Sequence, residues 1–322
     1  MQNIHIGPLP PVFNGISVYL YRLSKIEKNS VFIDWNKIKS LNNFIKWLLR
    51  QILSFKRKNF IFHPPSINQR LILFLMTYFS IHKSSLVIHG FPLISQYNDS
   101  SRFTRVLIRQ MLNKAYYIQL VNPSYKIFLN HLKIKNQRII VKNAYLPPPL
   151  GEEESILKSY DRKILDFVKN RSPLLIANAA CIRFVKGIDG YGFDLCLELT
   201  RLLKNIYPNV GFFFALANET RYPDYFQKLK EKIKEYNIED NFFFMTGQKE
   251  LWPLFKKADL FLRPTISDGD AISIREALSF GCNVIASRVC RRPNGTVLFE
   301  NRNIQDLFRV CKESLKVLKH NK

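Results

Sequence analysis

The sequence predicts an α/β protein of two Rossmann-like, doubly wound domains with a cleft between them. Apolar runs of strand length alternate with amphipathic runs of helix length along the 322 residues, a pattern typical of parallel sheets with helices on both faces. Residues 146–154 read LPPPLGEEE, a stiff, solvated stretch typical of a domain boundary. We therefore expect one domain over residues 1–148 and a second over residues 149–322.

The first domain is expected to contain six strands separated by segments of helix length. Its strand-like apolar runs lie at residues 4–6, 30–33, 59–62, 86–88, 117–121 and 138–141. Ligands of doubly wound sheets bind beyond the carboxyl ends of the strands, so we expect functional residues at that edge.

In the second domain, strand-like and helix-like segments alternate more regularly than in the first. Strands are expected at residues 174–177, 210–216, 242–245, 260–263 and 284–286. Helices are expected at residues 193–203, 225–236, 250–257, 271–280 and 304–319.

Charge is distributed unevenly between the two halves. The chain has 49 Lys and Arg against 25 Asp and Glu, a net charge of +24. Residues 1–150 hold 21 basic and 3 acidic residues, or +18, and the remainder holds 28 and 22, or +6. A half this basic attracts polyanions: nucleic acid, an anionic membrane or phosphorylated small molecules.

The cysteines and the amino-terminus indicate a reducing, cytoplasmic location. The five cysteines are odd in number, lie only in the second half and show no metal-binding spacing, which argues against a disulfide framework or structural zinc. The amino-terminus lacks the basic and apolar regions of a signal peptide. The longest apolar run, residues 71–79, has about half of the roughly 20 residues that cross a bilayer.

Residues 38–55 predict a strongly amphipathic helix. Apolar residues recur at three- and four-residue spacing, and Lys39, Lys46 and Arg50 fall on the opposite face. One interpretation is a sheet-covering helix with a solvated face. The other is an interfacial helix whose cations meet anionic lipid headgroups, with Trp35, Trp47 and Phe44 at the headgroup boundary.

Residues 258–298, ADLFLRPTISDGDAISIREALSFGCNVIASRVCRRPNGTVL, are the most informative segment. A strand ending at Pro264 leads into a polar loop and then a helix with Asp270 as its expected N-cap. Helix amino-termini bind phosphate, and Gly269 lets a ligand approach the backbone. Asp268 in the loop and Glu276 inside the helix can both face the cleft, where carboxylates accept hydrogen bonds from sugar hydroxyls.

This segment resembles the donor-binding signature of retaining glycosyltransferases of family 4, the group 1 glycosyltransferases, which have the GT-B fold. The family motif is two Glu residues separated by seven; here Asp268 and Glu276 are so separated. The resemblance implies that Glu276 binds the nucleotide ribose and that Asp268 contacts the transferred sugar. It also implies a loop lying against sugar and phosphate, formed by Gly269, Asp270, Ala271, Ile272 and Ser273. Many members have an aromatic residue at position 270, so the sugar preference of better-known members does not carry over.

Other motifs occur in the order that the family has them. NAACIRFVKGIDGYG, at residues 178–192, resembles its Arg/Lys diphosphate clamp; Arg183 and Lys186 would neutralise the leaving group as it gains charge. The resemblance further implies that Gly247 lies under the base, that Gly15 approaches the donor phosphate, and that His89 lies near the transferred sugar. Residues 139–149, IIVKNAYLPPP, resemble its interdomain segment.

A metal site is not expected. Residues 268–270 read DGD, like the DxD metal motif of the other large glycosyltransferase fold. That motif belongs to a strand-end loop of a single-domain architecture, whereas this one opens a helix late in a second domain. We expect no metal and no cofactor besides the nucleotide-sugar donor.

The expected activity is transfer of a hexosyl residue from a UDP- or GDP-linked sugar to a saccharide hydroxyl, with retention of configuration. The resemblance implies front-face attack without a covalent enzyme intermediate. One alternative is a basic nucleic-acid-binding protein without enzymatic activity, which leaves residues 258–298 unexplained. Another is a different GT-B enzyme, such as a sugar-nucleotide epimerase, which would need no acceptor.

The basic half suggests the acceptor and the location. An anionic membrane surface and a lipid-linked oligosaccharide fit its +18 charge and amphipathic helix. We therefore expect a peripheral protein on the inner face of the cell membrane that acts in O-antigen, capsule or exopolysaccharide biosynthesis.

Overall fold

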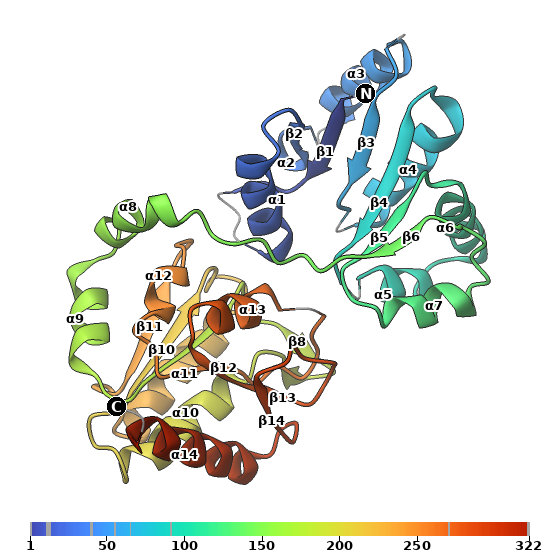
Figure 1. Cartoon of the computed structure of the whole chain (residues 1–322). Coiled ribbons are helices and arrows are strands. Elements are labelled where there is room, and N and C mark those ends of the chain that lie inside the picture. Colours follow the sequence, from blue (N-terminus) through green and yellow to red (C-terminus); the bar gives the residue numbers. More distant parts are fainter. Residues whose placement is uncertain are drawn as a thin grey trace. The chain divides into compact units, whose positions relative to one another are not determined.

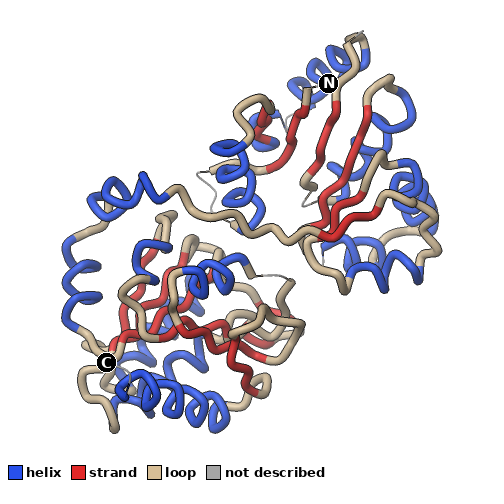
Figure 2. Tube along the Cα trace, viewed as in Figure 1, coloured by secondary structure: helices blue, strands red, loops and turns tan. Residues whose placement is uncertain are grey.

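The computed structural model describes residues 2–10, 14–38, 41–54, 56–64, 66–90, 92–269 and 271–320. The chain divides into two compact units, Met1–Leu146 and Pro147–Lys322. Each unit is built around one six-stranded parallel sheet flanked by helices (Figures 1 and 2). The observed division lies inside the LPPP segment. The GEEE that follows forms η1 (Leu150–Glu152) and the start of α8 (Glu153–Lys158).

The sheet of the first unit has the strand order β2-β1-β3-β4-β5-β6. Its strands are β1 (Asn3–Gly7), β2 (Val31–Asp34), β3 (Asn59–Phe62), β4 (Lys83–Ile88), β5 (Ile118–Leu120) and β6 (Ile139–Val141). Its helices are α1 (Gly15–Ile26), α2 (Trp35–Ile38), α3 (Leu41–Ile52), α4 (Ile67–Phe79), α5 (Pro92–Asn98), α6 (Arg102–Lys114) and α7 (Tyr125–His131). All six strands expected from the sequence are present.

The chain order reverses between β1 and β3, because β2 lies on one side of β1 and β3 to β6 follow on the other. Such a switch point, at the carboxyl ends of the strands, is the usual ligand position in doubly wound sheets.

The helix expected over residues 38–55 is present as α3, which spans Leu41–Ile52 and so ends three residues earlier than expected. The structure has two helices, α2 and α3, and residues 39, 40 and 55 lie outside the described part. The ring of Trp47 packs edge-on against Phe60 of β3, at 5.9 Å between centroids, while Lys46, Leu49 and Arg50 are exposed. The side chains of Leu41, Phe44, Ile45, Leu48 and Ile52 are not among those described.

The sheet of the second unit has the strand order β11-β10-β7-β12-β13-β14. Its strands are β7 (Leu174–Ala179), β10 (Gly211–Leu216), β11 (Phe242–Thr246), β12 (Leu260–Arg263), β13 (Asn283–Ser287) and β14 (Thr296–Phe299). A separate hairpin joins β8 (Phe184–Val185) to β9 (Ile188–Asp189). The helices are α9 (Arg162–Asn170), α10 (Phe193–Lys204), α11 (Pro223–Glu235), α12 (Trp252–Phe255), α13 (Ile272–Ser279) and α14 (Ile304–His320), besides α8.

The second sheet is buried on both faces, as its continuous apolar strands require. One core cluster joins α10, α11 and α14 to the sheet, and the other joins α9, α12 and α13 to its opposite face. Phenylalanines pair across β10 and β11: Phe212 stacks on Phe242 and Phe213 on Phe243, at 5.1 and 5.6 Å. Since β10 and β11 lie on one side of β7 and β12 to β14 on the other, this unit has its switch point between β7 and β12.

Candidate functional site

Two loops meet at the switch point of the second unit, one after β7 and one after β12. The amide of Ile266 donates to the carbonyl of Gly190 at 3.2 Å. Gly192 has φ +71, and a Cβ there would lie 2.5 Å from the carbonyl oxygen of Pro264. Only glycine permits this close packing, which fixes the loop bearing Arg183 against the loop bearing Asp268.

The carboxylate of Asp268 is held between two arginines. Arg263 Nε and Arg292 Nη1 donate to Asp268 Oδ2 at 2.9 and 2.8 Å, and the amide of Gly269 donates to Oδ1 at 3.1 Å. The side chain of Asp268 is 11% exposed and that of Arg292 is 2% exposed. Burial alone would raise the pKa of Asp268, but the charges and hydrogen bonds of Arg263 and Arg292 outweigh it and hold that pKa well below its usual range.

Arg183 belongs to the same cluster. Its Nη2 donates to the carbonyl of Ser267 at 3.2 Å, one residue before Asp268. Arg183 and Arg263 both lie over the ring of Tyr191, each at 5.3 Å from the centroid. The Nε of Arg183 is buried and has no hydrogen-bond partner within the described residues. The structure therefore places Arg183 beside the loop that carries Asp268, with one N–H of its guanidinium not used in a hydrogen bond to a described residue.

Lys186 lies at the tip of the β8–β9 hairpin. Lys186 and Gly187 form its two-residue turn, with φ +51 and +78, as type I′ hairpin turns require. The Lys186 side chain is exposed. It makes no hydrogen bond or ion pair with another described residue. The hairpin thus presents a free ammonium from the loop that carries Arg183.

Among the described residues, no side chain caps the amino-terminus of α13. The prediction that Asp270 would be the N-cap was wrong in register: Ala271 holds that position, with no side-chain hydrogen bond, and the helix begins at Ile272. Asp270 lies outside the described residues. Ile272 and Ser273 are half-buried in the first turn, and Glu276 is buried one turn further on, at 6% exposure.

The contrast with α10 is informative. There Asp189 accepts hydrogen bonds from the amides of Tyr191, Gly192 and Asp194. The carboxylate of Asp189 therefore occupies the amino-terminus of α10, where an anionic ligand would otherwise bind. The first turn of α13 contains no acidic residue, and its N-cap, Ala271, makes no side-chain hydrogen bond. Its positive end can therefore attract an anionic ligand.

Gly247 follows β11, further along the same edge of the sheet. Its φ of +88 favours glycine, and a Cβ built there would meet nothing within 4 Å. A ligand can therefore approach the backbone at this position.

Gly15 and His89 belong to the first unit, at the carboxyl edge of its sheet. Gly15 opens α1 after a capping box in which Asn14 accepts from the amides of Ile16 and Ser17. His89 directly follows β4. The ring of Tyr19, in α1, packs edge-on against His89 at 5.2 Å between centroids, which brings α1 close to His89.

His89 ends a chain of hydrogen-bonded histidines that the sequence did not reveal. His89 Nε2 lies 2.8 Å from His63 Nδ1, and His63 Nε2 lies 3.1 Å from His5 Nδ1. His5 Nε2 then meets Glu27 Oε2 at 3.2 Å. The chain crosses three adjacent strands, since His5 is in β1, His63 follows β3 and His89 follows β4.

The carboxylate fixes the direction of every hydrogen bond in this chain. An ionised carboxylate only accepts, so His5 must donate from Nε2, which leaves its Nδ1 as an acceptor. His63 must then donate from Nε2 to His5 Nδ1, and His89 must donate from Nε2 to His63 Nδ1. His89 Nδ1 therefore carries a lone pair, and within the described part of the chain nothing donates to it.

Burial keeps these rings neutral. It lowers the pKa of His89 to about 3. It also holds the pKa of His63 well below the usual value, and the neighbouring His89 and His5 add to this effect. Burial lowers the pKa of His5 as well, and Glu27 partly offsets it. Neutral rings can each donate once and accept once, as the chain requires.

Sequence reasoning missed five residues of these clusters: Arg263, Arg292, His5, His63 and Glu27. Arg263 and His63 could have been found, because each stands at the carboxyl end of a predicted strand. Arg292 lies 24 residues from Asp268 in sequence, and no local pattern connects them.

The described residues contain neither a metal-binding cluster nor a membrane-spanning helix. No group of three or more His, Cys, Asp or Glu side chains there could hold a metal ion. No helix in those residues is long and apolar enough to cross a membrane.

Several known proteins are similar to this chain in sequence or in structure. The sequence profile described as "Glycosyl transferases group 1" matches residues 170–306. The chain is 23% identical over 313 residues to "Protein CapJ" of Staphylococcus aureus, covering 88% of this chain and 75% of that protein. It is similar to the structure of Anabaena Alr3699/HepE with UDP and glucose, at TM-score 0.71 and 10% identity over 99% of this chain and 91% of that one. A glycosyltransferase from Rickettsia africae ESF-5 gives a TM-score of 0.66 at 15% identity, over 98% and 89% of the two chains.

Proposed function

Given a chain that has the GT-B fold and carries a group 1 glycosyltransferase domain over residues 170–306, we propose that it transfers a hexosyl residue from a UDP- or GDP-linked sugar to a saccharide hydroxyl, with retention of configuration. One observation carries the proposal. The arginine-held Asp268 and the uncapped amino-terminus of α13 lie at the switch point of the second sheet, inside the residues that match the family. The HepE structure contains UDP and glucose, which favours UDP among the candidate bases.

In this proposal the second unit binds the donor. The diphosphate lies between the amino-terminus of α13 and the cations of Arg183 and Lys186, and the ribose is bound by Glu276. The charge of the Arg183 guanidinium and the free ammonium of Lys186 can stabilise negative charge as the nucleoside diphosphate departs. Gly247 leaves room for the base, and Gly15 leaves room for phosphate at the first unit's own edge.

Asp268 acts in two ways in this proposal. Its carboxylate orients Arg263 and Arg292 and thereby fixes the loop before α13. Its remaining lone pairs accept hydrogen bonds from hydroxyls of the transferred sugar.

His89 offers the lone pair of Nδ1 to a hydroxyl group. The hydrogen-bond chain from Glu27 keeps the Nε2–H tautomer, so this atom accepts and does not donate. It can orient a sugar hydroxyl, with the proton staying on the sugar. Transfer needs no charged imidazole, in agreement with the lowered pKa of His89.

For the acceptor we propose a lipid-linked oligosaccharide at an anionic membrane. The first unit's +18 charge and the exposed Lys46, Leu49 and Arg50 of α3 support this. Binding to vesicles that contain phosphatidylglycerol at low salt, and release at about 1 M salt, where the Debye length is roughly 3 Å, would agree. Absence of low-salt binding would contradict the membrane part only. Transfer is proposed to need no metal or cofactor, so chelators should leave the rate unchanged.

A thermal-shift panel of UDP, GDP, ADP and their sugars tests the donor site. A ligand at 100 times its Kd adds about 2.7 kcal/mol to the stability of the folded state, so a true donor raises the melting temperature visibly. Glu276→Ala should abolish the shift, whereas Glu239→Ala, at an exposed position of the same unit, should keep it. If the two variants respond alike, the donor site is placed wrongly.

Acceptor dependence separates transfer from epimerisation. A transferase releases nucleotide only when an acceptor is present, and an epimerase changes the sugar without one. Salt-sensitive binding to DNA, together with no shift from any nucleotide, would instead favour the nucleic-acid-binding alternative.

A further inference from the structure

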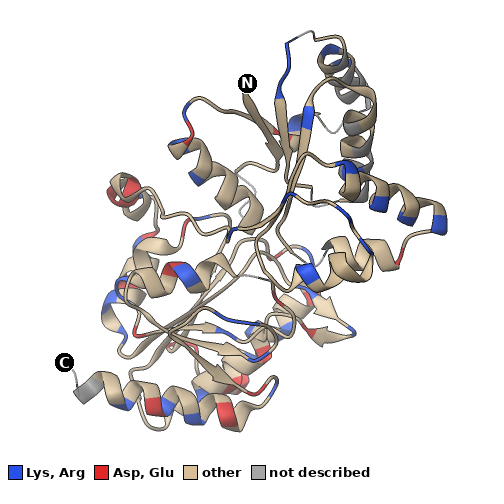
Figure 3. Ribbon diagram, turned by 45° about the vertical axis from the view of Figure 1, so that its right-hand side comes forward, with Lys and Arg blue, Asp and Glu red and all other residues tan. Residues whose placement is uncertain are grey.

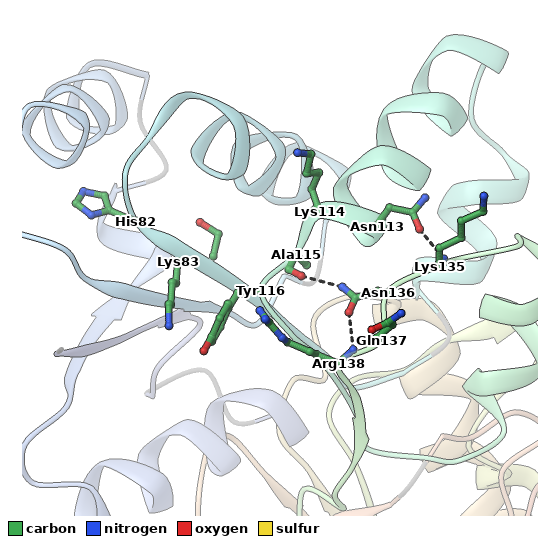
Figure 4. A pocket seen from close by; sticks show the side chains of 11 residues that line it. His82, Lys83, Asn113, Lys114, Ala115, Tyr116, Lys135, Asn136, Gln137 and Arg138 are labelled. Carbon is green, nitrogen blue, oxygen red and sulfur yellow. Dashed lines mark hydrogen bonds between the residues drawn. The ribbon is translucent and has the colours of Figure 1, made fainter.

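The amino-terminal edge of the first sheet carries a pocket that the proposed reaction does not use. It has a volume of about 420 Å³ and lies where β4, β5 and β6 begin, between residues 82–84, 113–116 and 135–138 (Figure 4). In a parallel sheet this is the edge opposite the one that bears His89. The volume falls within the range of small-molecule pockets, roughly 300–1,000 Å³.

Four cations line this pocket: Lys83, Lys114, Lys135 and Arg138. None has a carboxylate partner among the described residues. Residues 1–146 hold only three acids. Glu27 is bound to His5, Asp34 accepts from the amides of Leu9 and Asn36, and Asp99 does not line the pocket.

The walls of the pocket are fixed by hydrogen bonds. The Asn136 amide donates to the carbonyls of Leu112 and Ala115 at 3.0 and 2.8 Å, and its oxygen accepts from the Arg138 amide at 2.8 Å. These bonds fasten the loop that carries Lys135 and Arg138 to the end of α6. The site is therefore organised before any ligand binds.

Tyr116 lies between two of the cations, with Lys83 Nζ 3.9 Å and the Arg138 guanidinium 4.7 Å from its ring centroid (Figure 4). The ring holds both cations beside the pocket without neutralising them. A hydrogen bond from Lys83 lowers the pKa of Tyr116, as expected where positive charge accumulates.

A buried hydroxyl lies in the wall of the pocket. Ser84 lines the pocket and is 3% exposed, yet its Oγ has no hydrogen-bond partner among the described residues. This hydroxyl has almost no accessible surface, so it belongs to the wall of the pocket and not to the ligand-binding groups.

We propose that this pocket binds a phosphate group, held by Lys83, Lys114, Lys135 and Arg138. Phosphate oxygens accept charge-assisted hydrogen bonds from lysine and arginine. The phosphate belongs either to a membrane lipid headgroup or to a soluble compound. The proposal does not depend on the glycosyl transfer reaction.

Titration calorimetry of the full chain with inorganic pyrophosphate tests the site. A Lys186→Ala background weakens pyrophosphate binding at the proposed donor site, and any binding that Arg183 retains there is common to all the variants compared. Lys83→Gln with Arg138→Gln should weaken binding about tenfold or more. The matched control, Arg109→Gln with Lys126→Gln, removes the same charge from exposed positions of the same unit and should change affinity less than about threefold, because distant surface charges are screened.

A further variant guards against misfolding. Lys114 and Lys135 are exposed, so Lys114→Gln with Lys135→Gln should weaken binding without lowering the melting temperature. Equal pyrophosphate affinity of pocket and control variants, or no binding by the parent protein, would overturn the proposal.

Vesicles distinguish the two sources of phosphate. The chain is floated with phosphatidylcholine vesicles that contain or lack phosphatidylglycerol. If the pocket variant loses both pyrophosphate and phosphatidylglycerol binding, the ligand is a lipid headgroup. If it loses pyrophosphate binding alone, the ligand is soluble. Both results support a phosphate site.

Discussion

At the scale of single residues, the first unit shows how one carboxylate determines the chemistry of a distant imidazole. Glu27 lies at the end of α1, three histidines away from the lone pair of His89. Because each ring is neutral, the direction set at Glu27 passes unchanged along the chain. His5 and His63 therefore act as positioning residues for His89.

Replacing Glu27 by Gln should disturb His89 without unfolding the unit. A Gln amide can donate as well as accept, so the His5 tautomer is no longer fixed. We expect kcat to fall about tenfold, less than the ~10²-fold or more that full acid–base catalysis contributes, with little change in donor KM. Asp99→Asn, the matched carboxylate change in the same unit, should keep the parental rate.

Nitrogen NMR of the histidine rings gives a readout that a purely structural role would not move. In the parent chain His89 should carry its proton on Nε2, and Glu27→Gln should yield a mixture of tautomers. A single unchanged tautomer in that variant would contradict the directional chain.

In the second unit, Asp268 is expected to contribute to stability as well as to binding. Asp268→Asn leaves Arg263 and Arg292 buried without their counter-charge, and breaking a buried pair costs about 3–5 kcal/mol. The free energy of unfolding of this unit, measured with urea, should fall by that amount in Asp268→Asn. It should stay unchanged in Asp240→Asn, at an exposed position. An Asp268→Asn chain as stable as its parent would mean that the arginines do not depend on this carboxylate.

At the scale of elements, the turn of the β8–β9 hairpin contributes to the proposed diphosphate site in two ways, through the charge of Lys186 and through the backbone conformation of Gly187. Lys186→Asn keeps a residue that tolerates φ +51 but removes the cation, and Gly187→Ala keeps the cation but strains a position at φ +78. Both should weaken nucleotide binding, while the melting temperature of the free protein stays nearly constant because the turn is exposed. Gly151→Ala is the control, since that glycine has open space and no left-handed φ. Unchanged nucleotide affinity in both hairpin variants would exclude the hairpin from the site.

The elements that the sequence predicted are those with strong apolar patterns. All six strands of the first unit and five of the second stand where buried runs such as residues 59–62 and 210–216 required them. The β8–β9 hairpin has two residues per strand, too few for a periodic pattern. Both β14 and α9 are short, and α9 has only Ile164 and Val168 buried, so neither was expected.

The candidate site was predictable only where its residues are close in sequence. The segment from Asp268 to Glu276 is continuous, so its motif could be recognised. The pairing of Asp268 with Arg292 and the chain from His89 to Glu27 depend on which strands become neighbours, and the sheet order decides this.

At the scale of the whole molecule, the two units differ in charge and in how they should respond to acid. Lys and Arg far outnumber Asp and Glu along the first unit, whereas the second carries both signs (Figure 3). Five of the six histidines lie in the first unit. The carboxylate at the centre of the second unit's cluster, Asp268, has a lowered pKa instead.

Mild acid should therefore destabilise the first unit and spare the second. The unfolded chain protonates a histidine near pH 6.5, whereas burial lowers the pKa of folded His5 and His63, and that of His89 to about 3. Between these values the unfolded state binds more protons, so stability falls as pH falls, by up to about 1.4 kcal/mol per pH unit for each such ring. Asp268 is ionised in both states until the pH approaches 3.8, so its contribution persists through the same window.

Hydrogen exchange at pH 7.5 and pH 5, corrected for intrinsic rates, should show a larger increase in opening at pH 5 in peptides of residues 1–146 than in those of residues 147–322. His63→Gln removes one titrating ring and should flatten the response of the first unit. Equal acid sensitivity in both units would contradict the neutral histidine chain.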